Sequence, residues 1–155
     1  MVTATVVGDE ALAAKFTAAI ATLQAESPYW IHDMGLMVQE SILDVINREG
    51  LIESGDLARS GRTFYQTANG ISVGFGKGLD YAQAIEHGAR PHPIVATNPS
   101  GLLHFQLPSG EWFVGPAVNH PGNKPYKFVY RGALEACIPI LMFFSSKLRA
   151  MFGGM

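Results

Sequence analysis

Apolar residues recur at helical spacing near the start of the chain. In the segment 9–24 the steps of three and four residues connect Leu12, Phe16, Ala19, Ile20 and Leu23. This spacing predicts an amphipathic helix with these residues on its inner face. Asp9 is the predicted N-cap of that helix, and the β-branched run 3–7 before it predicts a short strand.

The same periodicity resumes after Ser27 and predicts a second helix. Ser27 is its predicted cap, and Pro28 falls in its first turn, where the missing N–H costs least. The helix is expected to end near Glu49, with an inner face made of Ile31, Met34, Val38, Ile42, Val45 and Ile46. The two segments together form a predicted helical region, 9–49.

The middle of the chain is patterned for strands, after a polar segment 51–62 that predicts a loop. The runs "TFYQTA" and "ISVGFG" are separated by Asn69 and Gly70, a dipeptide typical of a tight hairpin turn. A second hairpin is predicted from "LLHFQL" and "EWFVGPAV", joined by residues 108–110. Together the hairpins predict an antiparallel β-sheet in the region 62–118.

Helical spacing returns in a closing helix that is predicted over 126–150. Its predicted inner face consists of Phe128, Leu134, Ile138, Leu141 and Phe144. Pro139 is expected to kink or split this helix, because the proline ring clashes with the carbonyl four residues earlier. The order of helices, two hairpins and a C-terminal helix predicts an α+β fold in a single domain, 1–155.

Composition limits the partners that the chain can have. Hydrophobic residues make up 48% and charged residues 15% of the sequence, while soluble domains average about a quarter charged. Some apolar surface is therefore expected to meet a partner. The formal charge of −2 provides no basic field for generic nucleic-acid binding.

Targeting and membrane signals are not expected from the pattern. The N-terminal residues lack a cationic leader followed by an apolar core, so no secretory signal is predicted. The longest apolar run, 136–144, is far shorter than the ~20 residues of a membrane span. Cys137 lies within this run and is predicted to be a small core residue.

Five histidines raise the question of a metal site or an acid–base site. An alternative function is a metal-dependent hydrolase that uses His87, His92, His104 and His120 together with Glu86. The sequence contains neither an HExxH pair nor a CxxC pair, and the serines at 54, 60, 100 and 109 lack a GxSxG setting. We therefore expect no enzyme activity, no metal and no cofactor.

The stretch "YAQAIEHGARPHPI", 81–94, is better explained as a structural joint. Tyr81 and Ile85 are four residues apart and are expected to face the sheet, with Glu86 bonded to a backbone amide or an arginine. Gly88 is the predicted end of the turn. Pro91 and Pro93 are expected to hold the next segment extended and to remove donors that would pair with a further strand, leaving 94–101 as an exposed loop.

The segment "HPGNKP", 120–125, is expected to act in a similar way. His120 and Pro121 are predicted to end the sheet, Gly122 and Asn123 to turn the chain, and Pro125 to direct it into the last helix.

Three motifs in order resemble the head–tail joining and tail-completion proteins of tailed bacteriophages, a family that includes tail terminators and minor tail components. They are "SGDLARSGRTF" (54–64), "YAQAIEHGARPHP" (81–93) and "HPGNKPYKFVYRGALEA" (120–136). Ser54 replaces the more usual threonine, and His87 stands where an aromatic residue is common.

This resemblance implies a structural virion protein at the neck. Such a protein forms a ring of identical copies, sixfold in symmetry, between the head connector and the tail tube, and it is assembled in the host cytoplasm. Its implied partners are further copies of itself, the connector, stopper or adaptor proteins, and the tail tube protein. DNA passes through the ring without being specifically bound, and no membrane is involved. A non-viral adaptor of the same fold is the remaining alternative.

Overall fold

The computed structural model describes residues 10–51, 54–67, 70–107 and 109–152. These residues form two compact units: unit 1 extends up to Leu79 and resumes at Phe128, and unit 2 is Asp80–Lys127. The predicted sheet region 62–118 is thus divided between the two units, while a single domain over 1–155 stays a prediction. The predicted strand 3–7 and its following cap, Asp9, lie outside the described residues.

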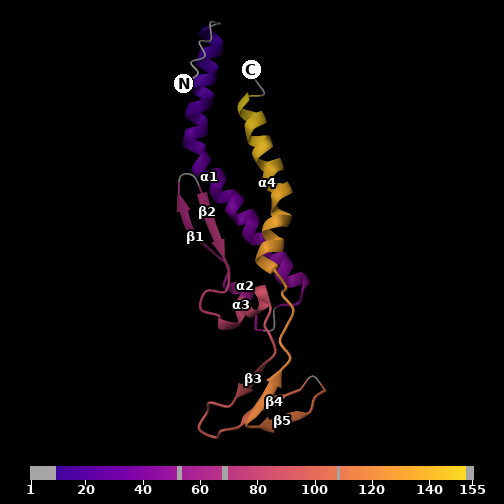
Figure 1. Cartoon of the computed structure of the whole chain (residues 1–155). Helices are drawn as coiled ribbons and strands as arrows, with labels where there is room; N and C mark the ends of the chain where they lie inside the picture. The colour runs from indigo at the N-terminus through magenta and orange to yellow at the C-terminus, as the bar shows by residue number, and fades with distance from the viewer. Residues whose placement is uncertain (1–9, 52–53, 68–69, 108, 153–155) are drawn as a thin grey trace. The chain divides into compact units, whose positions relative to one another are not determined.

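The chain contains four helices and six strands within the described residues (Figure 1). In order they are α1 (Glu10–Arg48), α2 (Asp56–Arg59), β1 (Arg62–Thr67), β2 (Gly70–Gly74), α3 (Asp80–His87), β3 (His92–Val95), β4 (Leu103–Gln106), β5 (Trp112–Gly115), β6 (Ala117–His120) and α4 (Phe128–Phe152). The strands pair antiparallel as β1–β2, β3–β6 and β4–β5.

The α+β class, with two hairpins between a long N-terminal helix and a C-terminal helix, is confirmed. The hairpins do not join into one sheet, and the β3–β6 pair was not predicted. The predicted loop 51–62 contains the short helix α2, which buries Leu57.

Residues 10–48 form one helix, so the prediction of two helices with Ser27 as a cap is wrong. Pro28 lies inside α1. A proline within a helix removes one backbone hydrogen bond, but the flanking turns continue because their apolar residues pack on neighbouring elements. Figure 1 shows α1 changing direction about halfway along its length, which is the expected effect of an internal proline.

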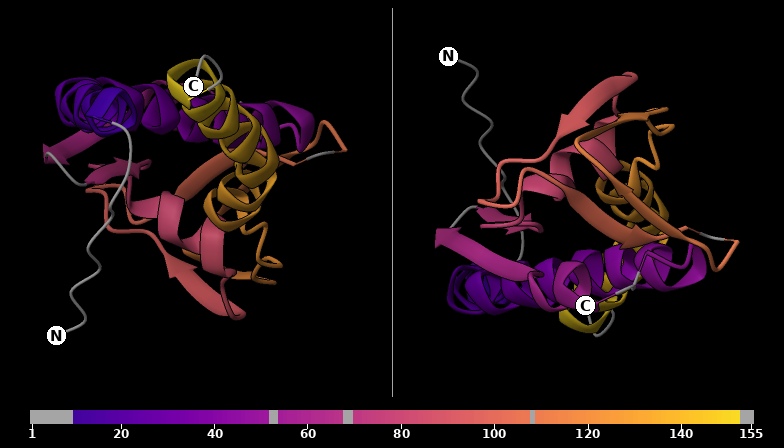
Figure 2. Two further views of the ribbon diagram at one scale, coloured as in Figure 1. Left: turned by 90° about the horizontal axis from the view of Figure 1, so that it is seen from above. Right: turned by 90° about the horizontal axis from the view of Figure 1, so that it is seen from below.

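The core of unit 1 lies where α1 meets α4. The buried apolar residues of this unit are Ala19, Trp30, Ile42, Val45, Ile46, Leu57, Phe128 and Ala136. The predicted inner positions 42, 45 and 46 of α1 are therefore confirmed. The two helices run antiparallel in Figure 1, and the views along the vertical axis in Figure 2 show α4 lying obliquely across α1.

Gly132 sets the distance between the two helices. A Cβ atom added there would lie 2.5 Å from the Cα of Ile42, so only a glycine permits this approach. Two ion pairs, Arg48–Glu135 at 2.7 Å and Arg131–Glu49 at 2.6 Å, connect the same two segments. The helices are thus closely packed at Gly132, and oppositely charged side chains pair beside this contact.

The predicted inner face of α4 is wrong for three of its five residues, whereas Phe128 is buried and Phe144 packs on Trp30 of α1, with ring centres 6.2 Å apart. Leu134, Ile138 and Leu141 are 60–69% exposed. The helix instead turns its small residues Gly132 and Ala136 toward α1, because these allow the backbones to approach. Cys137 follows Ala136 by a third of a turn and is exposed, so its predicted core position is also wrong.

The first turns of α1 differ from the prediction for another reason. Ala19 is buried as expected, but Leu12, Phe16 and Ile20 are exposed. Figure 1 shows the N-terminal end of α1 extending past the C-terminal end of α4, so this apolar face continues beyond the helix that covers it.

α4 is also the helix, among those described, that is long and apolar enough by composition to cross a membrane. The nine-residue apolar run considered in the sequence analysis is only part of that helix. Arg131 and Glu135 lie in its first half, where Arg131 pairs with Glu49, just after α1, and Glu135 pairs with Arg48 of α1.

Candidate functional site

The nine residues predicted to form an interface motif all fall in unit 2. They belong to α3, the turn after it, β3, and the end of β6. The residue that α3 buries is Ala82, while Tyr81 is 42% exposed and Ile85 is half-buried. The expectation that Tyr81 packs inward is therefore wrong, and the small neighbouring side chain takes that place.

Two segments of unit 2 that are far apart in sequence close on one another. Ala89 N–H donates to the carbonyl of Asn123, and Asn123 N–H donates to the carbonyl of Ala89, both at 3.0 Å. We call the paired segments 84–92 and 120–127 the clasp. The predicted turns thus form one structure in which each segment fixes the other.

Two glycines make the clasp possible. Gly88 and Gly122 both have φ near +80°, a conformation that side chains other than glycine rarely adopt. A Cβ atom at Gly122 would overlap the carbonyl oxygen of Ala89, and one at Gly88 would lie 2.9 Å from the carbonyl oxygen of Asn123. Glycine is required here both by the dihedral angle and by the closeness of the opposite strand.

The clasp also satisfies the C-terminal end of α3. The Asn123 side-chain amide donates to the carbonyl of Ala84 at 2.8 Å. The N–H groups of Tyr126 and Lys127 donate to the carbonyls of Ile85 and Glu86, at 2.9 and 3.1 Å. The last carbonyls of a helix have no partner within the helix, so these three bonds anchor α3 to the segment before α4.

Sequence reasoning identified Asn123 only as a turn residue and missed its capping role. The available signal was an asparagine directly after a glycine and two residues before a proline, which indicates a turn without indicating its partner.

Pro93 lies within a paired strand, contrary to the prediction that the prolines prevent pairing. β3 and β6 pair in the register His92↔His120 and Pro93↔Asn119. Ala96 N–H donates across the ladder to the carbonyl of Pro116. Alternate residues of a strand direct their N–H groups to opposite edges of the strand. The backbone nitrogen of Pro93 therefore points away from β6, and the N–H that proline lacks is not needed for the pairing.

Residues Ile94 and Val95 continue β3 and are exposed. The loop predicted over 94–101 therefore begins two residues later than predicted.

His92 and His120 lie side by side across this ladder, with ring centres 5.2 Å apart. His92 Nδ1 is 2.8 Å from the carbonyl oxygen of Arg90, and His120 Nδ1 accepts the N–H of Gly122 at 3.0 Å. Each imidazole therefore uses one nitrogen to hold a backbone turn of the clasp.

The other histidines do not join this pair. His104 stacks on Trp112, with ring centres 4.7 Å apart, and His87 is exposed at the end of α3. No three His, Cys, Asp or Glu side chains within the described part of the chain are grouped to hold a metal ion.

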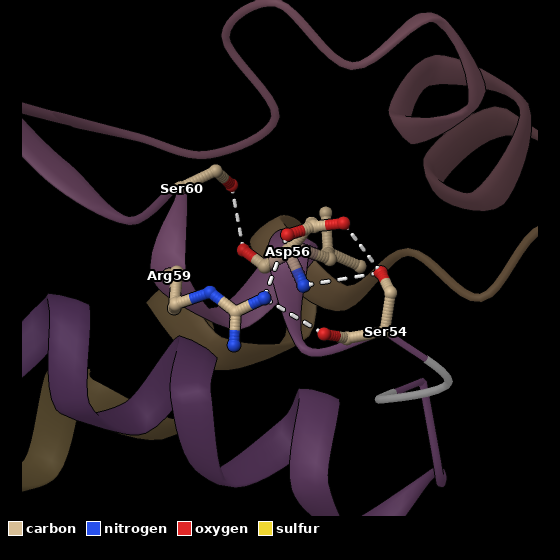
Figure 3. Close-up of polar contacts among 5 residues, drawn as sticks. Ser54, Asp56, Arg59 and Ser60 are labelled. Atoms are coloured by element: carbon tan, nitrogen blue, oxygen red, sulfur yellow. Dashed lines mark hydrogen bonds and ion pairs between the residues drawn. The ribbon is translucent and has the colours of Figure 1, made fainter.

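The motif "SGDLARSG" forms a second ordered cluster, in unit 1 (Figure 3). The hydroxyl of Ser54 donates to the Asp56 carboxylate at 2.7 Å, and the Arg59 guanidinium donates to the other carboxylate oxygen at 2.7 Å and to the Ser54 carbonyl at 2.8 Å. The Ser54 hydroxyl and the Arg59 guanidinium lower the pKa of Asp56. The cluster is a closed turn whose groups bind one another.

Ser60 connects this turn to the first hairpin. Its hydroxyl donates to the Leu57 carbonyl at 2.6 Å and accepts the N–H of Gly76 at 2.7 Å. Ser100 donates to the Asn98 side chain, and Ser109 accepts the N–H of Glu111. The four serines considered as nucleophiles all take part in local turns.

An open groove of about 580 Å³ lies between α1 and α4. Its wall includes Lys15, Glu26, Trp30 and Lys147. The Trp30 indole donates to Glu26 at 3.1 Å, and the Lys147 ammonium lies 5.9 Å from the centre of the Trp30 ring. These contacts link Glu26, Trp30 and Lys147 to one another.

No protein-family model, curated protein or solved structure matches the chain. The resemblance to phage tail-completion proteins therefore rests on the residues of the three motifs.

Proposed function

We propose that this protein is a structural component of a tailed-phage virion. It forms a ring of identical copies at the interface between head and tail, where it completes the tail and joins it to the head connector. The proposal assigns it no catalytic step and no cofactor. Its partners are other copies of the chain, the connector, stopper or adaptor proteins, and the tail tube.

The amount of exposed apolar surface is the observation that carries the proposal. Among the described residues, twenty large apolar side chains are exposed, whereas nine apolar residues form the buried core. A monomer that works alone rarely leaves so much apolar surface in water, because each such surface is a site for association. Subunits of an assembly bury it against their neighbours.

Unit 2 supports the proposal by presenting part of this surface on a fixed framework. Trp112 and Val114 of β5 are about 60% exposed, and His104 of the paired strand stacks on Trp112. The clasp holds both ends of this unit through backbone bonds. A rigid surface binds a partner at a lower entropic cost than a mobile one.

Electron microscopy of the purified full-length chain tests the proposal. We expect closed rings of one copy number, since a contact between two different surface patches closes when its rotation divides a full turn. Addition of isolated tails that lack this protein should place the rings at the tail end that meets the head. A chain that stays monomeric at all concentrations and binds neither tails nor connectors would refute the proposal.

A further inference from the structure

The outward face of α4 carries a continuous apolar stripe. Leu134, Ile138 and Leu141 lie opposite the residues that contact α1, and Met142 lies beside them. These four side chains are 60–69% exposed. Between Glu135 and Lys147 the helix has no charged residue. We call these four residues the α4 stripe.

The spacing of the stripe has the period of a coiled-coil seam. From Leu134 the steps are four, three, four, three and four residues, which gives in order Leu134, Ile138, Leu141, Ser145, Leu148 and Phe152. When Leu134 is assigned to heptad position d, Leu141 and Leu148 occupy the following d positions. Ile138, Ser145 and Phe152 then occupy the a positions. This is a pattern by which parallel helices interdigitate their side chains.

The exposed area is sufficient for a stable contact. The large apolar side chains on the outward side of α4 are Tyr130, Leu134, Ile138, Leu141 and Met142, at 60–69% exposure. With about 200 Å² for each large apolar side chain, they present roughly 650 Å². One partner of a standard stable protein–protein interface buries about 600–1,000 Å².

The other face of α4 restricts what the occupant can be. That face is held by α1 through the Gly132 contact and two ion pairs. α1 carries many charged residues along its length, among them Lys15, Asp33, Glu40 and Asp44. A bilayer around α4 would have to accept this charged helix as well, which is costly. The arrangement favours a protein surface over lipid.

We propose that the occupant of the α4 stripe is the α4 stripe region of a second copy of this chain, with the two helices parallel. The identity of the partner rests on the self-association of the proposed function. Two parallel helices that present the same stripe to each other are related by a twofold axis along them, so this contact joins copies in pairs. Closure of a ring then requires a second contact between two different patches.

Cysteine cross-linking in the full-length protein tests the pairing directly. Cys137 is first replaced by serine, and Ile138→Cys is then introduced, which places one thiol at the centre of the seam. Ser146→Cys in the same background is the matched control, because Ser146 is exposed on α4 but lies away from the seam. We expect mild oxidation to give a covalent dimer from the first variant and monomer from the second, since parallel pairing brings equivalent a positions within disulfide reach. Equal cross-linking of both variants, or of neither, would overturn the inference.

Sedimentation of Ile138→Lys separates this inference from the proposed function. We expect self-association to weaken by about 100-fold or more, while Ser146→Lys leaves it unchanged. Ile138 is 69% exposed, so the circular dichroism and thermal midpoint of the monomer should not change. Rings that persist in Ile138→Lys would overturn the inference and leave the ring proposal standing. A wild-type protein that stops at a dimer through this stripe would support the inference and refute the ring.

The same variants distinguish a lipid occupant. Wild-type protein that stays monomeric and sediments with vesicles of phosphatidylcholine and phosphatidylglycerol, with loss of binding in Ile138→Lys, would assign the stripe to a bilayer and overturn the pairing.

Discussion

At the scale of single residues, two glycines and one asparagine hold unit 2 together. Gly88 and Gly122 let the segments of the clasp approach, and Asn123 bonds across them to the end of α3. None of the three is a chemically reactive group. Their effect depends on backbone geometry, so it should be visible in stability and in amide exchange.

We expect Gly122→Ala to open the clasp. An alanine there would have an unfavourable positive φ and would overlap the carbonyl of Ala89, so the loss of stability should be about 2–4 kcal/mol. Gly101→Ala is the matched control, because Gly101 also has positive φ but an added Cβ meets nothing within 4 Å, and it should cost about 1 kcal/mol. Thermal unfolding and hydrogen exchange of peptides that span 84–90 and 120–127 measure both. Equal effects of the two substitutions would show that the close approach is unimportant.

Asp56 should make the turn of unit 1 sensitive to acid. The Ser54 hydroxyl and the Arg59 guanidinium lower the pKa of Asp56 in the folded state below its unfolded value. The unfolded chain therefore binds this proton first, and the stabilisation is complete above the unfolded pKa and is lost as the pH falls through the folded pKa. Asp56→Asn should lower the thermal midpoint slightly at neutral pH, because the ion pair is largely exposed, and the difference should shrink as the pH falls below about 4.

Thermal melts across this pH range check that expectation, with Asp33→Asn on the exposed face of α1 as the control. A difference between wild type and Asp56→Asn that stays constant down to the most acidic sample would contradict the assigned hydrogen bonds.

At the scale of elements, the contact of α1 with α4 organises unit 1. Small residues, and not the largest apolar ones, lie at the point of closest approach. This choice leaves Leu134, Ile138 and Leu141 of α4 exposed. α4 thus packs against α1 with one face and leaves its opposite face exposed.

Gly132→Ala should destabilise unit 1, although glycine to alanine within an exposed helix normally gains about 1 kcal/mol. The added methyl group would lie 2.5–2.7 Å from Ile42 atoms, two of them in the backbone, so α1 and α4 must separate. We expect a net loss of about 2 kcal/mol in chemical denaturation. Ser146→Ala, at an exposed position of the same helix, should change stability by no more than about 0.5 kcal/mol. A Gly132→Ala variant more stable than wild type would show that the helices are not in contact there.

At the scale of the whole molecule, the exposed apolar surface and the low charge indicate assembly with other proteins. The eleven basic and thirteen acidic residues leave a formal charge of −2. Few phosphates of a duplex would be neutralised by such a chain. The proposed ring would therefore let DNA pass without holding it.

We therefore expect weak or undetectable binding of duplex DNA at moderate salt. Filter retention or fluorescence anisotropy with a duplex of random sequence measures this, and a salt titration separates phosphate contacts from other binding. Micromolar or tighter affinity that weakens steeply with salt would contradict the prediction and would point to a basic lumen in the assembled state.

The sequence by itself determined the types and order of the main elements. Helical spacing predicted the C-terminal helix and most of α1, and the Asn69–Gly70 and 108–110 turns predicted two hairpins in the right places. These features depend on local preferences of a few neighbouring residues, which a single sequence contains. The glycine turns at 88 and 122 were predictable for the same reason.

Only the tertiary structure decided which faces are buried and which distant segments meet. Periodicity placed Leu134, Ile138 and Leu141 inside, but the approach of α1 to Gly132 turned them outward. The Ala89–Asn123 bridge and the β3–β6 pair join residues more than twenty positions apart, and no local pattern encodes such a pairing. Pro28 stays within α1 because packing on both sides of a proline compensates for the hydrogen bond that the proline removes, and packing is a property of the whole fold.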